Sequence, residues 1–233
     1  MVHYIVSEND PQTSGLEAPY IKLYTAATPN GFKVTALLEL LGLDYYVRPI
    51  DIMSAECKEP WYLKFNPNGR IPSLTHADDS GNVNHINESA AIMMYLCDKF
   101  DKDYKFSFPH GSSEYYEMLE WTFFQMAGLG PMKGQFHWFT FAARKGNVDE
   151  FAIDRYKKET IRLFGVLEDR LEREKSGFLV GGKLSIADLC SYPWIVAMKL
   201  DELENFPRLV QWVDRLGEIP EIKSGMAIPA PKK

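Results

Sequence analysis

The chain has 233 residues, of which 45% are hydrophobic and 25% are charged, and its formal net charge is −6. This composition fits a packed globular protein and excludes a wholly disordered chain. No basic stripe is present, so nucleic acid is not an expected partner. No apolar run approaches the roughly 20 residues that span a bilayer, so no membrane association is expected.

Residues 1–19 lack the features of a secretory signal, because one short apolar stretch is followed by the polar run Ser7–Asp10. The three cysteines, Cys57, Cys97 and Cys190, lie far apart, with no C-x-x-C motif and no histidine at metal-binding spacing. We expect reduced, partly buried thiols in a soluble cytoplasmic protein, and no bound metal.

Residues 20–100 alternate between strand-like and helical patterns. Helical spacing of apolar residues follows Asn30 and stops at Gly42, and a second such helix runs from Glu88 to Phe100. The remaining segments are strands at 20–25, 45–51, 71–76 and 83–86 and a short helix at 60–65. The order βαβαββα predicts a thioredoxin-like α/β domain over residues 20–100, with helices on the faces of a mixed sheet.

Residues 112–222 are predicted to form a separate all-helical domain, after a linker at 101–111. One long helix carries an apolar stripe that starts near Phe151. Another begins at Ser185, with Asp188 three residues later to complete a capping box, and Leu184 and Leu189 are placed to form a hydrophobic staple. A last helix spans 206–217, and the tail from Pro220 is expected to be irregular.

Seven aromatic residues crowd two helical segments around 128–134, and most are expected in the core. They are Trp121, Phe123, Phe124, Phe136, Trp138, Phe139 and Phe141. Met132 and His137 are candidates for an apolar pocket that holds an electrophile. A hydrogen-bonded core position is the alternative for His137, since no residue accompanies it at metal-binding spacing.

The expected junction of the first strand and first helix reads Thr28-Pro29-Asn30-Gly31. A glutaredoxin attacks disulfides with a cysteine at this place, and this chain has none. The positive end of a helix, with donors from Thr28 and Asn30, suits the thiolate of a bound ligand instead. An ordinary helix start capped by Asn30 is the alternative.

Two further motifs suit a small peptide ligand. The backbone of Ile71, before a Pro72 that is a candidate cis residue, is suited to pair with an extended peptide. Glu88 offers a carboxylate to an ammonium group, and Ser89 at a helix start suits a carboxylate. A routine helix cap is the alternative for the Glu-Ser pair. The three motifs together describe glutathione, a thiol peptide with an amino-acid-like head and an acidic tail.

These motifs and the later Ser185–Leu189 helix start resemble the glutathione transferases over roughly residues 20–222. Thr28–Gly31 and the run Gly128–Gln135 resemble more narrowly the bacterial Nu class and the fungal transferases related to the yeast nitrogen-catabolite regulator. The resemblance implies that Asn30, with Thr28, holds the glutathione sulfur. It also implies glutathione contacts for Arg70, Ile71, Pro72, Glu88, Ser89 and Arg155. A solvated charge on the surface of a helix is the alternative for Arg155. Ala90 departs from the family, which usually carries glycine there.

The resemblance implies a homodimeric detoxification enzyme that uses glutathione as co-substrate. The bound thiolate attacks an electrophilic carbon or a small disulfide, and catalysis rests on positioning and thiolate stabilisation without a covalent enzyme intermediate. Two alternatives stay open. One is a non-catalytic glutathione-binding regulator, although residues 1–19 are far shorter than the Asn-rich tail of the yeast regulator. The other is a transferase dedicated to one biosynthetic pathway.

Overall fold

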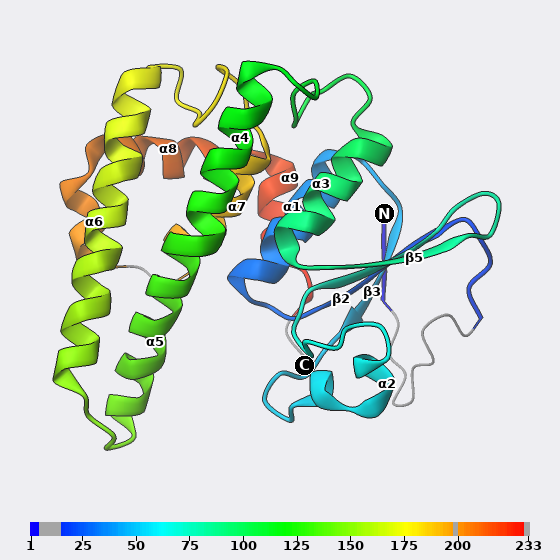
Figure 1. Ribbon diagram of the computed structural model, residues 1–233, viewed down its shortest axis with the longest axis horizontal. Coiled ribbons are helices and arrows are strands. Elements are labelled where there is room, and N and C mark those ends of the chain that lie inside the picture. Colours follow the sequence, from blue (N-terminus) through cyan, green and yellow to red (C-terminus); the bar gives the residue numbers. More distant parts are fainter. Residues whose placement is uncertain (5–14, 198–199, 231–233) are drawn as a thin grey trace. The chain divides into compact units, whose positions relative to one another are not determined.

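The computed structural model describes residues 1–4, 15–197 and 200–230 (Figure 1). The polar run Ser7–Asp10 therefore lies outside the described residues. The chain forms two compact units, one of residues 1–100 with 220–233 and one of residues 101–219. No helix within the described ranges has the length and apolar character to cross a membrane.

The first unit is built on a five-stranded mixed sheet of order β1-β3-β2-β4-β5. β2 is parallel to β3, β3 is parallel to β1, and β4 is antiparallel to both β2 and β5. The strands are β1 (Val2–Tyr4), β2 (Tyr20–Thr25), β3 (Tyr45–Pro49), β4 (Ser73–Ala77) and β5 (Val83–Asn87). The thioredoxin-like prediction is confirmed. The added strand β1 was not predicted, because three residues show no periodicity.

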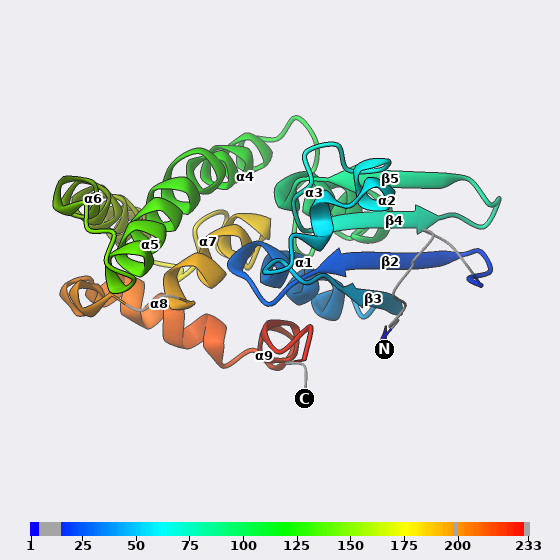
Figure 2. The ribbon, with the colours of Figure 1, turned by 90° about the horizontal axis from the view of Figure 1, so that it is seen from below.

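Helices α1 (Pro29–Leu40) and α3 (Ser89–Phe100) pack side by side in this unit (Figure 2). The short helices η1 (Glu56–Lys58) and α2 (Pro60–Leu63) precede β4. Tyr24 of β2 packs edge-on against Tyr62 of α2, with ring centroids 6.0 Å apart, and tilted against Phe65 at 4.8 Å. This aromatic cluster fixes the segment that leads into β4.

The tail from Pro220 is a helix, α9 (Pro220–Met226), and the expectation of an irregular tail is wrong. Thr35 of α1 donates a 2.7 Å hydrogen bond to the carbonyl oxygen of Gly225. A Cβ atom on Gly225 would lie 2.4 Å from Ala36 Cα, so only glycine allows this approach. Residues 220–222, which the sequence assigned to the helical domain, therefore belong to the first unit.

The second unit is helical, with α6 alongside the run from α4 to α5 (Figure 1). A π-helical turn, η2, joins α4 to α5, and the Gly130 amide donates to the carbonyl of Gln125. Pro131 has no N–H to continue an α-helical ladder, which explains the wider turn there. The helices are α4 (Ser113–Phe124), η2 (Gln125–Leu129), α5 (Gly130–Arg144), α6 (Glu150–Glu174), α7 (Ile186–Val196), η3 (Asp201–Asn205) and α8 (Pro207–Gly217).

The predicted capping box at the start of α7 is confirmed. The fully buried Asp188 carboxylate accepts hydrogen bonds from the Ser185 amide at 3.0 Å, the Leu179 amide at 2.9 Å and Trp212 Nε1 at 2.9 Å. Burial raises the pKa of Asp188 to about 6, and these donors oppose the rise. The carboxylate thereby ties α7 to the chain before it and to α8.

The aromatic residues around 128–134 are mostly not buried, which corrects the expectation of a core cluster. Trp121 is buried, but the exposed fractions of Phe123, Trp138 and Phe141 are 56%, 63% and 39%. Phe124, Phe136 and Phe139 are half-buried. Helical spacing identifies a common face but does not say whether another element covers it.

Candidate functional site

The register of the sheet brings the three predicted motifs to one end of the first unit. Tyr24, at the end of β2, pairs with Ser73, the first residue of β4. Ser73 in turn pairs with Asn87, the last residue of β5. The segments that continue from these residues hold Thr28–Gly31, Ile71–Pro72 and Glu88–Ser89. The three motifs, which span about 60 residues of sequence, therefore share one edge of the sheet.

At the β2–α1 junction, Thr28 is the N-cap, so the alternative in which Asn30 caps the helix is wrong. Thr28 has extended backbone and its Oγ1 accepts from the Gly31 amide at 3.3 Å. Asn30 follows Pro29 in the first turn and is half-buried. A Cβ atom on Gly31 would lie 2.4 Å from the Ala26 carbonyl oxygen, so glycine is required for the chain to turn this closely.

The loop before β4 is held by two side chains that no sequence motif indicated. Tyr62 OH and Asn66 Nδ2 each donate to the Arg70 carbonyl at 2.7 Å. Asn66 Nδ2 also lies 2.7 Å from Ser73 Oγ. The Ile71–Pro72 peptide is cis, and Ile71 precedes the paired residues of β4. The Arg70 side chain is exposed.

At the β5–α3 junction, Glu88 adopts a left-handed backbone conformation with a φ of 70°. Its carbonyl accepts from the Ile92 amide at 2.9 Å, and its exposed carboxylate accepts from Asn68 Nδ2 at 3.4 Å. Left-handed conformations of residues other than glycine are uncommon and concentrate at functional sites. Ser89 is the first residue of α3 and is 2% exposed.

Lys33 of α1 reaches across to this junction. Its side chain is fully buried, and its Nζ donates to Ser89 Oγ at 3.3 Å. A buried ammonium group is unusual and needs a hydrogen-bonding partner. No sequence motif indicates Lys33, because its position in a helix gives no sign that it points to another motif.

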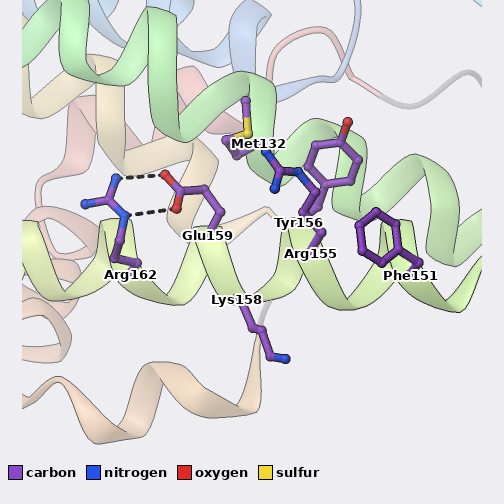
Figure 3. Close-up of a pocket in the computed structure, with 7 residues that line it drawn as sticks. All are labelled: Met132, Phe151, Arg155, Tyr156, Lys158, Glu159 and Arg162. Carbon is purple, nitrogen blue, oxygen red and sulfur yellow. Dashed lines mark hydrogen bonds and ion pairs between the residues drawn. The ribbon is translucent and has the colours of Figure 1, made fainter.

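The second unit contains a cavity of about 610 Å³ between α5 and α6 (Figure 3). Met132 comes from α5, and all other lining residues come from α6: Phe151, Arg155, Tyr156, Lys158, Glu159 and Arg162. Both Glu159 oxygens accept from Arg162, at 2.7 and 2.9 Å, and the dashed lines in Figure 3 mark these bonds. The Arg162 guanidinium holds the pKa of Glu159 below its usual range.

Arg155 projects toward Met132 within this cavity (Figure 3). In the described part of the chain it makes no hydrogen bond or ion pair. Tyr156 stacks on Phe139 with an interplanar angle of 16°. His137 is exposed on α5 and is not among the lining residues, so the cavity joins Met132 with Arg155 but not with His137.

Lys133 lies next to Met132 in sequence but points into the core. Its fully buried Nζ donates to the Ile195 carbonyl, near the end of α7, at 3.0 Å and lies 5.1 Å from the centre of the Phe164 ring. A cation at a helix C-terminus is favourable. Burial nevertheless lowers the pKa of Lys133 to about 7.

The chemistry of the two sites is that of charge pairing and hydrogen bonding. The sheet edge offers a carboxylate and a hydroxyl at one junction and a capped helix start at another. The cavity offers a guanidinium beside aromatic and thioether groups. Among the described residues, no three His, Cys, Asp or Glu side chains are grouped to hold a metal ion.

Comparison with known proteins identifies the family. The N-terminal domain profile of glutathione S-transferases matches residues 27–99, and the C-terminal domain profile matches residues 136–226. The disulfide-bond oxidoreductase YfcG of Escherichia coli is 38% identical over 86% of this chain and 91% of its own. This relative and the fungal structures below confirm the resemblance to the Nu class and to the fungal transferases.

Two solved structures are similar over nearly the whole chain. A glutathione transferase homologue from Lodderomyces elongisporus, with two glutathione molecules per subunit, is 41% identical with a TM-score of 0.84, over 90% of this chain and 99% of its own. The glutathione transferase URE2P6 from Phanerochaete chrysosporium, in complex with oxidised glutathione, is 40% identical with a TM-score of 0.80, over 89% and 95%. This chain belongs to the glutathione S-transferase family.

Proposed function

We propose that this transferase uses glutathione thiolate in two reactions. In one, the sulfur bonds to an electrophilic carbon, and the leaving group departs with its bonding electron pair. In the other, the sulfur attacks one sulfur of a small disulfide, forms a new disulfide and releases the other sulfur as a thiolate. The observation that carries the proposal is the convergence of Thr28, Ile71–Pro72 and Glu88–Ser89 at one sheet edge.

The Glu88–Ser89 junction takes the γ-glutamyl head of glutathione in this proposal. The exposed Glu88 carboxylate pairs with the ligand's ammonium, and the start of α3 with Ser89 receives its carboxylate. Arg70, Ile71 and Pro72 contact the rest of the peptide, and the Ile71 backbone pairs with it in the manner of an added strand. The bonds from Tyr62 and Asn66 to the Arg70 carbonyl support this role, because they fix the loop in advance.

Asn30 and Thr28 hold the sulfur. Thr28 already accepts from the Gly31 amide and so keeps its hydroxyl proton to donate. Asn30 sits in the first turn of α1, which contains no acidic residue, and the positive end of the helix favours a thiolate there. The catalytic contribution is a lower thiol pKa, since a free thiol with a pKa near 8.5 is only a few per cent ionised at pH 7.

The second substrate occupies the cavity between α5 and α6, with Met132 and Arg155 in contact with it. His137, which is exposed on the same helix as Met132, does not line this cavity. Arg155 suits a substrate that carries a carboxylate, since neighbouring Glu159 is already neutralised by Arg162. A glutathione-containing disulfide has such carboxylates. The oxidoreductase YfcG and the bound oxidised glutathione of URE2P6 support this choice.

The functional form in this proposal is a cytoplasmic homodimer. Tyr116 and Phe123, which lie seven residues apart on one face of α4, have exposed fractions of 63% and 56%. A second copy that covers this face would remove them from water. Light scattering of the purified protein measures the mass, and Phe123→Glu should shift a dimer toward the monomer.

The proposal is tested with a turnover screen that pairs glutathione with an aryl halide, a hydroperoxide and a small disulfide. We expect turnover of the disulfide and of the aryl halide. Arg155→Gln should lower kcat/KM for a carboxylate-bearing disulfide more than for an uncharged one. No glutathione-dependent turnover of any of the three would contradict the enzyme assignment and favour a regulatory binding protein.

Calorimetry tests the binding site itself. Glu88→Gln should weaken glutathione binding by about 1–3 kcal/mol, because the ligand's ammonium loses its charged partner. Glu59→Gln is the matched control, since Glu59 is exposed and its side chain does not cap α2. Equal affinities in the two variants would remove Glu88 from the site.

A further inference from the structure

Lys33 is a fully buried lysine that the proposed chemistry does not use. It lies on α1, the helix whose start is proposed to hold the sulfur, and its Nζ donates to Ser89 Oγ at the start of α3. A single rigid helix therefore connects the sulfur end of the site with its head-group end.

We propose that Lys33 is a positioning residue that sets Ser89 as a hydrogen-bond donor to the α-carboxylate of the γ-glutamyl group. This inference rests on the proposed role of the Glu88–Ser89 junction. A serine hydroxyl has one proton and can accept through its lone pairs. The bond from the Lys33 ammonium uses a lone pair of Ser89 Oγ, and in this proposal the Ser89 hydroxyl donates to the ligand carboxylate.

The charge of Lys33 strengthens this arrangement in two ways. A hydrogen bond from an ammonium group polarises the hydroxyl, which makes its own donated bond stronger. The positive charge also lies one side chain away from the expected carboxylate, in a part of the protein where solvent does not screen it. In this proposal Lys33 acts on the ligand through Ser89, to which its ammonium donates.

The test compares two ligands that differ in one group. Glutathione and γ-aminobutyryl-cysteinylglycine share the ammonium and the thiol, but the second lacks the α-carboxylate. We expect the native protein to prefer glutathione. Lys33→Met, which keeps the length of the side chain without its charge, should reduce this preference about 10- to 100-fold and leave the affinity for the decarboxylated ligand within about threefold.

Lys22→Met is the matched control, because Lys22 is also buried in the same unit, at 1% exposure, and lies in the sheet rather than at the junction. It should leave the preference within about twofold. In a Ser89→Ala background, Lys33→Met should have little further effect on the preference. An equal loss of affinity for both ligands would assign Lys33 a purely structural role and overturn the proposal.

A second measurement reads the response to ligand in the native protein. The side-chain ammonium of Lys33, followed by NMR in the native protein and assigned with Lys33→Arg, should shift on addition of glutathione and respond less to the decarboxylated ligand. Identical responses would also overturn the inference. A native protein that binds both ligands equally would instead contradict the proposed role of the Glu88–Ser89 junction, so the two failures are distinct.

Discussion

Asn30→Asp is expected to stabilise the fold and damage the chemistry at the same time. The first turn of α1 contains no acidic residue, and Thr28, not Asn30, provides the N-cap. A carboxylate in that turn interacts favourably with the positive end of the helix, by about 0.3–1 kcal/mol. The substitution keeps the size of the side chain and leaves the cap intact, so the free energy of unfolding should rise by this amount.

The same carboxylate would lie beside the glutathione sulfur. Two negative charges roughly 5 Å apart at an effective dielectric constant of about 20 repel each other by about 3 kcal/mol, which corresponds to a rise of about two units in the thiol pKa. Asn30→Ala removes only a charge-assisted hydrogen bond, worth about 1.5–3 kcal/mol, or one to two units. Turnover near neutral pH should therefore fall in both variants, at least as far for Asp as for Ala, and recover at high pH.

The assay follows the thiolate absorbance of bound glutathione against pH in the native protein and both variants, alongside urea denaturation. Thr28→Ser serves as a control, because it keeps the capping hydroxyl and should change neither measurement strongly. An unshifted titration in both Asn30 variants would show that Thr28 or the helix end alone stabilises the thiolate. A loss of stability in Asn30→Asp would refute the electrostatic argument for the start of α1.

Three further predictions concern the framework of the two units. Gly31→Ala should lower the free energy of unfolding by about 1–3 kcal/mol and weaken glutathione binding, because its Cβ would lie 2.4 Å from the Ala26 carbonyl oxygen. Gly134→Ala, whose Cβ would lie no closer than 3.4 Å to a neighbouring atom, should be tolerated, and similar losses of stability in the two variants would count against a steric cause. Asp188→Ala should lower the free energy of unfolding by about 3–5 kcal/mol, because it leaves the buried Trp212 and Leu179 N–H groups without an acceptor. Asp188→Asn, which keeps one carbonyl oxygen, should lower it less, and equal losses of stability in urea denaturation would contradict the hydrogen-bond explanation. For Lys133, the pKa falls from 10.5 to about 7 on folding, so the unfolded chain binds more protons between these values and stability rises with pH. Relative to Lys133→Met, the native protein should gain about 3 kcal/mol between pH 7 and 9.5. A difference in urea midpoints that does not change with pH would refute the lowered pKa.

The sequence by itself determined those features that depend on neighbours a few residues away. The capping box of Ser185 and Asp188 and the turn at Thr28–Gly31 follow from local hydrogen bonding and backbone restrictions. The sequence made Pro72 a candidate for a cis bond, and the structure contains this bond. Alternating strand and helix patterns likewise predicted the thioredoxin-like order. Asn30 was misassigned as the cap because Thr and Asn both favour that position, and only the backbone geometry separates them.

The tertiary structure decided what depends on residues that are distant in the chain. α9 packs on α1 through a hydrogen bond between Thr35 and Gly225, which are 190 positions apart, and no local pattern specifies such a partner. Periodicity likewise does not predict that Phe123 and Trp138 are exposed, because an apolar stripe has the same spacing whether or not another element covers it. The bond from Lys33 to Ser89 belongs to this class as well. A buried lysine is identified only when the fold closes over it, since desolvation is a property of the packed environment and not of the sequence around the residue.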